Sequence, residues 1–286
     1  MMRGQLLERS EGINEVLKKR NAGFAVAYTS VVKNNRIMEG YNLVKENEAI
    51  CPVVYYGESW WSESDEKVAD YLMNYEKRAD APSVNITKYY NSEYILSHVY
   101  PRVYGRRNMD NLDQFDRFYT EYLDMLVGYY VLIDELCTDT EIASMPLSNS
   151  DLERMHIDKE AVKREAIRHI CEEAEINTLI SMIPDASEMS FMFQDECKMY
   201  VVSNKRQING AAVILSRKVQ EKVAGLIGDS YYVLPSSIHE VICCPFDDAE
   251  ELKNMVYQIN REVVMLDDRL TDSVYRYENG VLDLVD

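Results

Sequence analysis

The sequence lacks the short motifs by which many nucleotide-using enzymes are identified. It contains no glycine-rich phosphate loop, no dinucleotide-binding fingerprint and no kinase-like set of motifs. Long apolar runs are also missing, because the longest, Met125 to Ile133, is far shorter than the roughly 20 residues that span a bilayer. Seven prolines and eleven glycines leave no room for a low-complexity linker. These absences disfavour a nucleotide-using enzyme and a membrane-spanning protein.

Histidine is scarce, and the six cysteines show no paired framework. His239 and Glu240 are not followed by a second histidine at helical spacing, which excludes a zincin-type site. Cys243 and Cys244 are adjacent and cannot chelate as a Cys-x-x-Cys pair does. We therefore expect no metal and no other cofactor. The N-terminus has no signal-peptide pattern, so we expect a cytoplasmic protein with free thiols.

The chain has a strong excess of negative charge. Its 286 residues carry a net charge of −18, while 47% hydrophobic and 28% charged residues are ordinary for a globular protein. An acidic surface repels phosphate backbones and anionic lipid, so we expect no direct nucleic-acid binding and no membrane. The charge is spread along the chain, which favours a solubilising surface over mimicry of nucleic acid.

Hydrophobic periodicity predicts an α+β fold, in which mixed or antiparallel sheets with β-hairpins are packed by amphipathic helices. The predicted helices lie at about 6–19, 65–76, 158–174, 216–227 and 248–261. The predicted strands form a hairpin within 23–44 and lie at about 49–56, 123–133, 198–203, 211–215, 231–234 and 274–277. Residues 89–122 are rich in tyrosine and give no single period.

Two lobes are one option for the domain organisation, an N-terminal α+β lobe at 1–140 and a C-terminal one at 141–286; a single domain is the other. Val31 to Asn34 with Gly40 matches Val201 to Asn204 with Gly210 in spacing. This similarity suggests two related lobes built from a duplicated unit.

The segment from Pro235 to Glu240 carries the most reactive side chains. A hydroxyl from Ser236 or Ser237 near His239 and Glu240 is the pattern of a nucleophile with its base. On a strand, however, Ser237 and His239 face one side and Glu240 the other, so a linear relay is disfavoured. The alternative is that the serines cap a turn after Pro235 while His239 and Glu240 bond to backbone.

Asn204, Asn209 and Gly210 border a short loop between two predicted strands. We interpret these residues as turn formers, since asparagine and glycine tolerate positive φ. Anion binding by Lys205 and Arg206 at the tip of the loop is the functional alternative.

Trp60 and Trp61 lie in a predicted loop between Glu58 and Glu63. Two exposed indoles are typical of a protein contact site. The alternative is that one indole packs on the core and the other is partly exposed.

Several segments resemble one family. They are 199–204, 209–212 and 232–241 in the C-terminal half, Val32 to Asn35 and Pro52 to Tyr55 near the N-terminus, Leu123 to Leu126, and Leu270 to Tyr275. Together they are similar to the domain-of-unknown-function family numbered 5688, found mainly in gut clostridia. The resemblance touches nearly the whole chain and implies no activity, substrate or cofactor.

We therefore expect a non-catalytic cytosolic protein-binding or regulatory protein with an acidic, aromatic-rich surface, and we favour no enzymatic activity. Its partner would be another protein or a second copy of itself. One alternative is a hydrolase that uses Ser236 or Ser237 with His239. A further alternative is a nucleic-acid mimic that inhibits a nucleic-acid-binding or defence protein.

Overall fold

The computed structural model describes residues 2–46, 48, 51–57, 60, 62–78, 84, 86–138, 141–182, 198–245 and 248–285. The chain forms two compact units, Met1–Lys88 and Tyr89–Asp286. The predicted lobe boundary at 140 lies inside the second unit, where strands on either side of it pair with each other. Among the described residues, no helix is both long enough and apolar enough to cross a membrane.

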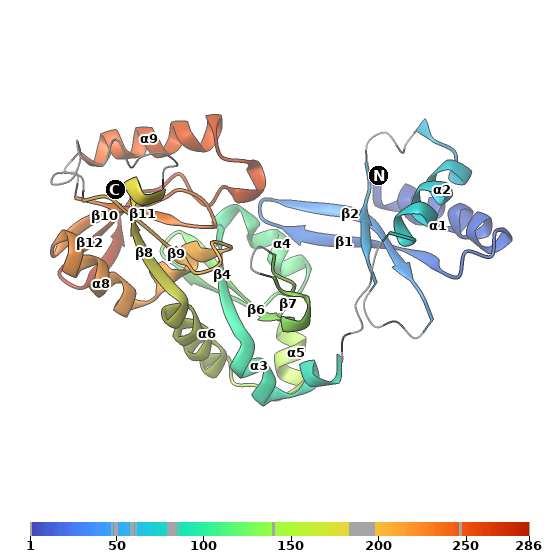
Figure 1. The fold of residues 1–286 in the computed structure, drawn as a ribbon, viewed down its shortest axis with the longest axis horizontal. Coiled ribbons are helices and arrows are strands. Elements are labelled where there is room, and N and C mark those ends of the chain that lie inside the picture. Colours follow the sequence, from blue (N-terminus) through green and yellow to red (C-terminus); the bar gives the residue numbers. More distant parts are fainter. Residues whose placement is uncertain are drawn as a thin grey trace. The chain divides into compact units, whose positions relative to one another are not determined.

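The first unit is a three-stranded sheet with two helices (Figure 1). Its elements are α1 (Met2–Lys19), β1 (Ala25–Lys33), β2 (Arg36–Val44), β3 (Val53–Tyr55) and α2 (Asp65–Glu76). The predicted hairpin is confirmed: β1 and β2 pair antiparallel around Asn34 and Asn35, and Asn35 has a φ of 64°. Asparagine tolerates this left-handed conformation better than most residues, which explains the tight turn.

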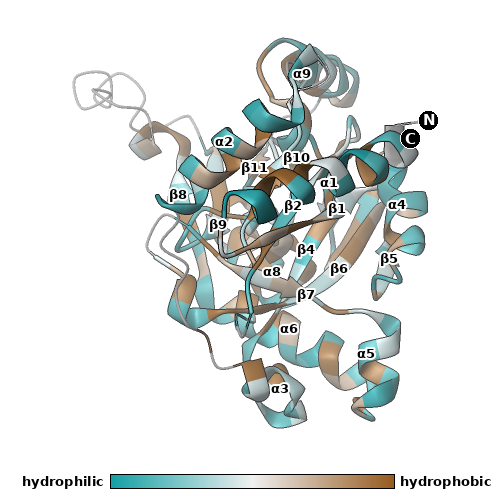
Figure 2. Ribbon diagram, turned by 90° about the vertical axis from the view of Figure 1, so that its right-hand side faces the viewer, coloured by the Kyte–Doolittle hydropathy of each residue, from teal (hydrophilic) through white to brown (hydrophobic). Residues whose placement is uncertain are grey.

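Local sequence determines where α2 begins. The Ser64 hydroxyl accepts from the N–H of Lys67, and Asp65 and Glu66 complement the positive end of the helix dipole. Val68 and Leu72 face the core of this unit, as the spacing predicts. In Figure 2, α1 and α2 alternate between hydrophilic and hydrophobic residues, which is typical of helices with one buried face.

The second unit contains a four-stranded and a six-stranded sheet, and every pairing among the described strands is antiparallel. The first part of this unit has η2 (Ile86–Tyr90), α3 (Ser92–His98), β4 (Val99–Gly105), η3 (Arg106–Asn108), α4 (Met109–Gln114), β5 (Tyr119–Tyr122), β6 (Met125–Leu132), η4 (Asp134–Leu136), β7 (Ser144–Pro146), α5 (Asn149–Arg154) and α6 (Lys159–Glu173). β6 is central, with β4 on one edge and β5 and β7 along the other, and all eight of its residues are buried. The buried strand predicted at 123–133 is thereby confirmed.

The rest of the second unit forms the six-stranded sheet, in the order β13-β12-β10-β11-β9-β8. Its elements are β8 (Ala174–Thr178), η5 (Leu179–Met182), β9 (Tyr200–Asn204), η6 (Gly210–Leu215), α8 (Arg217–Ile227), β10 (Ser230–Pro235), β11 (Val241–Cys244), α9 (Ala249–Glu262), η7 (Leu266–Asp268), β12 (Tyr275–Glu278) and β13 (Val281–Leu284). Helices α8 and α9 cover opposite faces of this sheet (Figure 1). Neighbouring residues of a strand point to opposite faces, and Tyr231 of β10 bonds to α8 whereas Tyr232 packs with Leu252 of α9.

One predicted strand is wrong. Residues 211–215 form the 3₁₀ helix η6 instead, and Ala211 to Ile214 are buried. A short apolar run has the same composition in a buried strand and in a buried helical turn, so periodicity could not separate the two. Asn209, with a φ of 54°, turns the chain out of the sheet just before this run.

Candidate functional site

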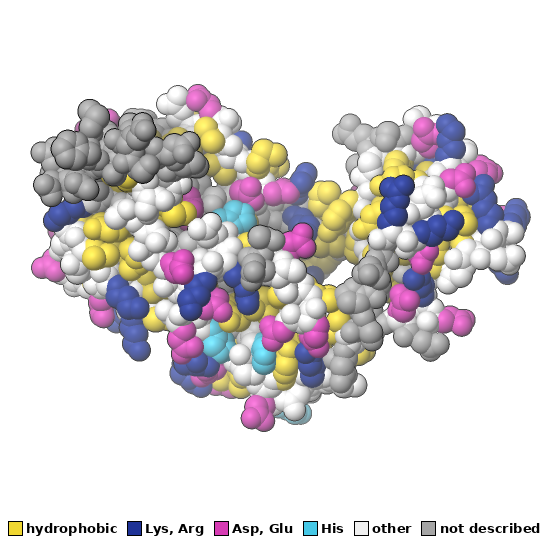
Figure 3. Space-filling view, in the orientation of Figure 1, with side chains coloured by type: hydrophobic (Ala, Val, Ile, Leu, Met, Phe, Trp, Pro, Cys, Tyr) yellow, Lys and Arg dark blue, Asp and Glu magenta, His cyan; other side chains and the backbone are white. Residues whose placement is uncertain are grey.

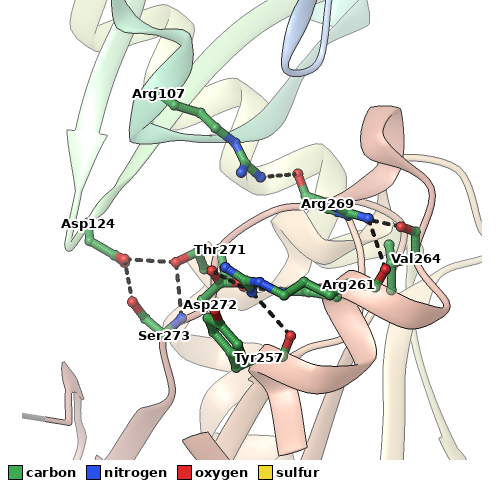
Figure 4. A network of polar contacts seen from close by, with 10 residues as sticks. Arg107, Asp124, Tyr257, Arg261, Val264, Arg269, Thr271, Asp272 and Ser273 are labelled. Carbon is green, nitrogen blue, oxygen red and sulfur yellow. Dashed lines mark hydrogen bonds and ion pairs between the residues drawn. The ribbon is translucent and has the colours of Figure 1, made fainter. Parts of the chain in front are cut away.

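A polar cluster that joins segments far apart in the sequence surrounds Asp124. Its carboxylate accepts hydrogen bonds from Thr271 Oγ1 at 2.9 Å, from Ser273 Oγ at 2.7 Å and from the hydroxyl of Tyr275. These three residues belong to the segment 266–275, here called the connector, which leads from α9 to β12. Figure 4 shows Asp124 reaching the connector from the β5–β6 turn.

Asp124 is held in place by a tight turn. Tyr122 and Met125 are paired, so Leu123 and Asp124 alone form the turn between β5 and β6. Leu123 has a φ of 54°, a left-handed conformation that is unfavourable for a leucine. Burial, and then the bond to Asp124, raise the pKa of Tyr275, so its hydroxyl keeps its proton and remains a donor.

The connector is held from other sides as well (Figure 4). The side-chain amide of Asn260 on α9 donates to the carbonyl of Thr271 and to Asp272 Oδ1, both at 2.8 Å. Arg107 donates to the carbonyl of Arg269 at 3.4 Å. Backbone groups of the connector are therefore bonded to α9 and to the segment after β4, which makes the connector a rigid link.

His239 ties the other end of the connector to the turn after β9. Its Nδ1 accepts from the backbone N–H of Asn209 at 3.2 Å, so this nitrogen carries no proton. Its Nε2 then donates to Asp268 Oδ1 at 3.2 Å. The backbone carbonyl of His239 accepts from Ser203 Oγ at 2.7 Å, and the N–H of Ile238 donates to the carbonyl of Asp268. The imidazole holds two loops together with both of its nitrogens.

The two serines of the predicted nucleophile motif have other partners. Ser237 Oγ accepts from the backbone N–H of His239 at 3.0 Å, and Ser236 Oγ donates to Glu240 Oε1 at 3.2 Å. Pro235 ends β10, and the N–H of Ser237 donates to the carbonyl of Glu240. The hydrolase hypothesis needs a serine hydroxyl beside a histidine ring, and this geometry gives it no support.

The residues interpreted as turn formers play three different roles. Asn204 closes the turn with its side chain, which donates to the carbonyl of Ile208 and accepts from its N–H. Asn209 adopts the left-handed conformation. Gly210 has no positive φ and is required for space: a Cβ there would lie 2.1 Å from Ser203 Oγ and 2.5 Å from the carbonyl oxygen of His239.

Lys205 and Arg206 lie in this loop and differ in exposure. Lys205 is exposed, and its backbone N–H donates to the carbonyl of Glu173. Arg206 is half-buried near Tyr100. Burial, and then the bond to Glu173, raise the pKa of Tyr100, and the charge of Arg206 opposes that rise. Arg206 therefore contributes to the electrostatics of α6 and β4, away from the loop tip.

Trp60 packs within an aromatic group of the first unit, and Trp61 lies outside the described residues. The ring centroid of Trp60 is 5.3 Å from that of Tyr56 and 5.2 Å from that of Tyr71, both in edge-on contact. Arg9 joins this group, with its guanidinium donating to the Tyr56 hydroxyl and to the carbonyl of Trp60. The half-buried indole thus forms part of the packing between α1 and the segment before α2.

Sequence reasoning did not identify Asp124 or Asp268 as site residues. Asp124 lies within Leu123 to Leu126, which carries the family resemblance, whereas Asp268 lies just before the family-like segment Leu270 to Tyr275. Nothing in either family-like segment indicates that the two segments meet. Asp124 and Tyr275 are 151 residues apart in the chain. In the structure two family-like segments of the second unit, 123–126 and 232–241, bond to the connector through Asp124 and His239.

A comparison with protein families gives a match that includes all of these segments. The model of a family of unknown function, DUF5688, matches residues 9–279, which is nearly the whole chain. Neither a curated protein nor a solved structure is similar enough to the chain to count as a match. The chain therefore belongs to the family of unknown function DUF5688.

Proposed function

We propose that this protein is a non-catalytic protein-binding or regulatory protein that contacts its partner through an exposed apolar strip at the end of α9. The strip consists of Met255, Ile259, Val263, Met265 and Leu266. Val263 is 73% exposed and Met265 is 72% exposed, and the other three are between 41% and 47% exposed. Contiguous exposed apolar side chains are typical of protein contact surfaces.

The spacing of these residues explains why they stay exposed. Leu252, Val256 and Asn260 form the buried face of α9. Met255 and Ile259 each follow a buried apolar residue by three positions, so they lie on the flank of that face. Figure 3 shows hydrophobic side chains on the visible side of α9. The apolar surface of the helix is wider than the sheet can cover, and the excess is available to a partner.

The connector supports this proposal because it holds the end of the strip rigid. Val263 and Val264 bond through their N–H groups to the carbonyl of Ile259, and Arg269 Nε donates to the carbonyl of Val264 at 2.9 Å. A contact surface that is already ordered loses little conformational entropy on binding. The connector, which contains the family-like segment Leu270 to Tyr275, therefore helps to hold the proposed binding surface in place.

Charge favours a different protein over a second copy as the partner. Two copies of a chain with a net charge of −18 repel each other at long range. We propose a partner that presents an apolar patch with a basic rim. A cytoplasmic location is part of the same proposal, supported by the free thiols of the described cysteines, Cys51, Cys137, Cys171, Cys243 and Cys244.

A capture experiment with matched variants tests the proposal. The double variant Val263→Glu/Met265→Glu places charges in the strip, and Leu226→Glu places one on α8, where Leu226 is 45% exposed. We expect a stoichiometric partner to bind the wild type and the Leu226 variant. We expect the purified partner to bind the double variant at least about tenfold more weakly, because a charge would be buried at the apolar contact.

Two outcomes would contradict this assignment. Equal loss of binding in both variants would place the contact elsewhere. If light scattering shows that the purified chain alone is a dimer, and that the double variant is a monomer, then the occupant of the strip is a second copy.

A further inference from the structure

A basic pocket lies in the second unit between α6 and the start of α8. Its volume is about 500 Å³, and its lining includes the cationic side chains of Arg164, Arg168, Arg217 and Lys218. Four cations around one pocket stand out in a chain with a net charge of −18. Figure 3 shows lysine and arginine side chains over α6 and α8.

The start of α8 is electrostatically unlike that of the neighbouring helices. α6 and α9 begin with a capping aspartate and carry glutamate in the first turn. α8 has eleven residues, no side-chain hydrogen bond at its N-cap and no acid in its first turn. Arg217 and Lys218 occupy its first two positions, where the helix dipole disfavours positive charge. A bound anion would supply the negative charge that this helix end lacks.

Ser216 gives an independent indication of a ligand. It is the N-cap residue of α8, only 2% exposed, and it lines the pocket. Its side chain makes no capping hydrogen bond at the start of α8. The hydroxyl can therefore donate to an acceptor bound in the pocket that Ser216 lines. The carbonyl of Ser216 is in contrast occupied by the N–H groups of Val219 and Gln220.

The cations differ in how far they are already neutralised. Arg168 bonds to Glu165 at 2.9 Å and to Glu172 at 2.8 Å. Arg217 and Lys218 form no ion pair within the described part of the chain. Glu172 also lines the pocket, but its carboxylate is held by Arg168. The uncompensated charge of the pocket is therefore positive and is concentrated at the first turn of α8.

We propose that this pocket binds a small organic phosphate monoester. The phosphate oxygens accept from the Ser216 hydroxyl, from the first backbone N–H groups of α8 and from the side chains of Arg217 and Lys218. Ile167 and Leu215 form an apolar part of the lining, which takes the organic group of the ester. A ligand of this class accepts hydrogen bonds from the first N–H groups of α8 and from Ser216, and its negative charge neutralises Arg217 and Lys218. The proposal does not depend on the apolar strip.

Calorimetric titration with phenyl phosphate tests this site. Inorganic phosphate, which lacks the apolar group, and benzoate, which replaces the phosphate by a carboxylate, are the comparison probes. We expect phenyl phosphate to bind most tightly. We expect Arg217→Gln/Lys218→Gln to weaken it by about tenfold to a hundredfold, since charge-assisted hydrogen bonds are lost. Lys222→Gln removes one positive charge from an exposed position on α8 and should leave the affinity unchanged.

Each other outcome overturns a defined part of the proposal. An absence of saturable binding to the wild type overturns the site. Equal weakening by Lys222→Gln indicates nonspecific attraction and overturns it too. Equal affinity for phenyl phosphate and inorganic phosphate would show that Ile167 and Leu215 do not bind the organic group. Equal affinity for phenyl phosphate and benzoate would show that the site does not prefer phosphate to carboxylate. Ser216→Ala removes a hydroxyl that makes no capping hydrogen bond to α8, and it should also weaken the binding of phenyl phosphate.

Discussion

Gly210 lies where three segments meet, and a side chain has no room there. A Cβ would come within 2.1 Å of Ser203 Oγ, 2.5 Å of the His239 carbonyl oxygen and 2.7 Å of the backbone nitrogen of Asn204. Two of these atoms belong to the backbone and cannot rotate away. The close approach allows Ser203 to donate to the carbonyl of His239 and so positions the histidine.

We expect Gly210→Ala to lower the free energy of unfolding by about 2 to 3 kcal/mol through overpacking. Gly225→Ala is the matched control, since Gly225 lies in α8 and has no atom within 4 Å of the added methyl group. It should raise stability by about 0.5 to 1 kcal/mol. Urea unfolding monitored by circular dichroism measures both changes. A Gly210→Ala variant as stable as the wild type would show that the loops separate easily.

At the scale of elements, Asp124 joins the β5–β6 turn to β12 and the segment before it. Removing its carboxylate leaves the part-buried Tyr275 hydroxyl without its partner. We expect Asp124→Ala to cost about 2 to 4 kcal/mol of unfolding free energy, and Tyr275→Phe about 1 kcal/mol. Chemical denaturation of the two single variants and the double variant measures their coupling. Strictly additive effects would show that the two groups do not interact.

The longer helices were predicted best because their signals are local, whereas the short helices α3, α4 and α5 were missed. α2 begins after Ser64 as expected, and α6 and α9 begin after the capping residues Asp158 and Asp248. The apolar spacing gave only part of each buried face, since Met255 and Ile259 on α9 and Leu226 on α8 are exposed. The signals for these elements lie within a few residues of the positions they determine.

Elements that depend on distant partners were missed. β8 and β11 were not predicted, because their ladders with β9 join residues far apart and their own sequences are short. The same limitation applies to the site. The bond between His239 and Asp268 and the cluster around Asp124 leave no periodic trace, since each depends on how separate segments pack. The basic first turn of α8, Arg217 and Lys218, was visible in the sequence, but its significance follows only from comparison with the other helices.

At the scale of the whole molecule, buried tyrosines make stability depend on alkaline pH. Burial raises the pKa of Tyr41, Tyr231 and Tyr275, and it raises the pKa of Tyr130 to about 12. A pKa that is higher in the folded chain means that the folded state holds more protons above about pH 10. The stabilisation is therefore complete below about pH 10 and is lost as the pH rises further.

We expect the free energy of unfolding to fall steadily between about pH 10 and about pH 11.5. Each tyrosine that stays protonated in the folded state contributes a slope of about 1.4 kcal/mol per pH unit. Tyr275→Phe removes one such group and should flatten the slope by that amount, and Tyr90→Phe, at an exposed tyrosine, should not. Urea titrations across this range give the slopes. Identical slopes for all three proteins would contradict this account.

The position of β6 has a consequence for how the second unit comes apart. Its eight buried residues form ladders with β4 along one edge and with β5 and β7 along the other. None of these outer strands can keep its pairing once β6 has left. The strands on both sides of it therefore melt together, as a single cooperative block, and the last amide protons to exchange with solvent in this block are those of β6.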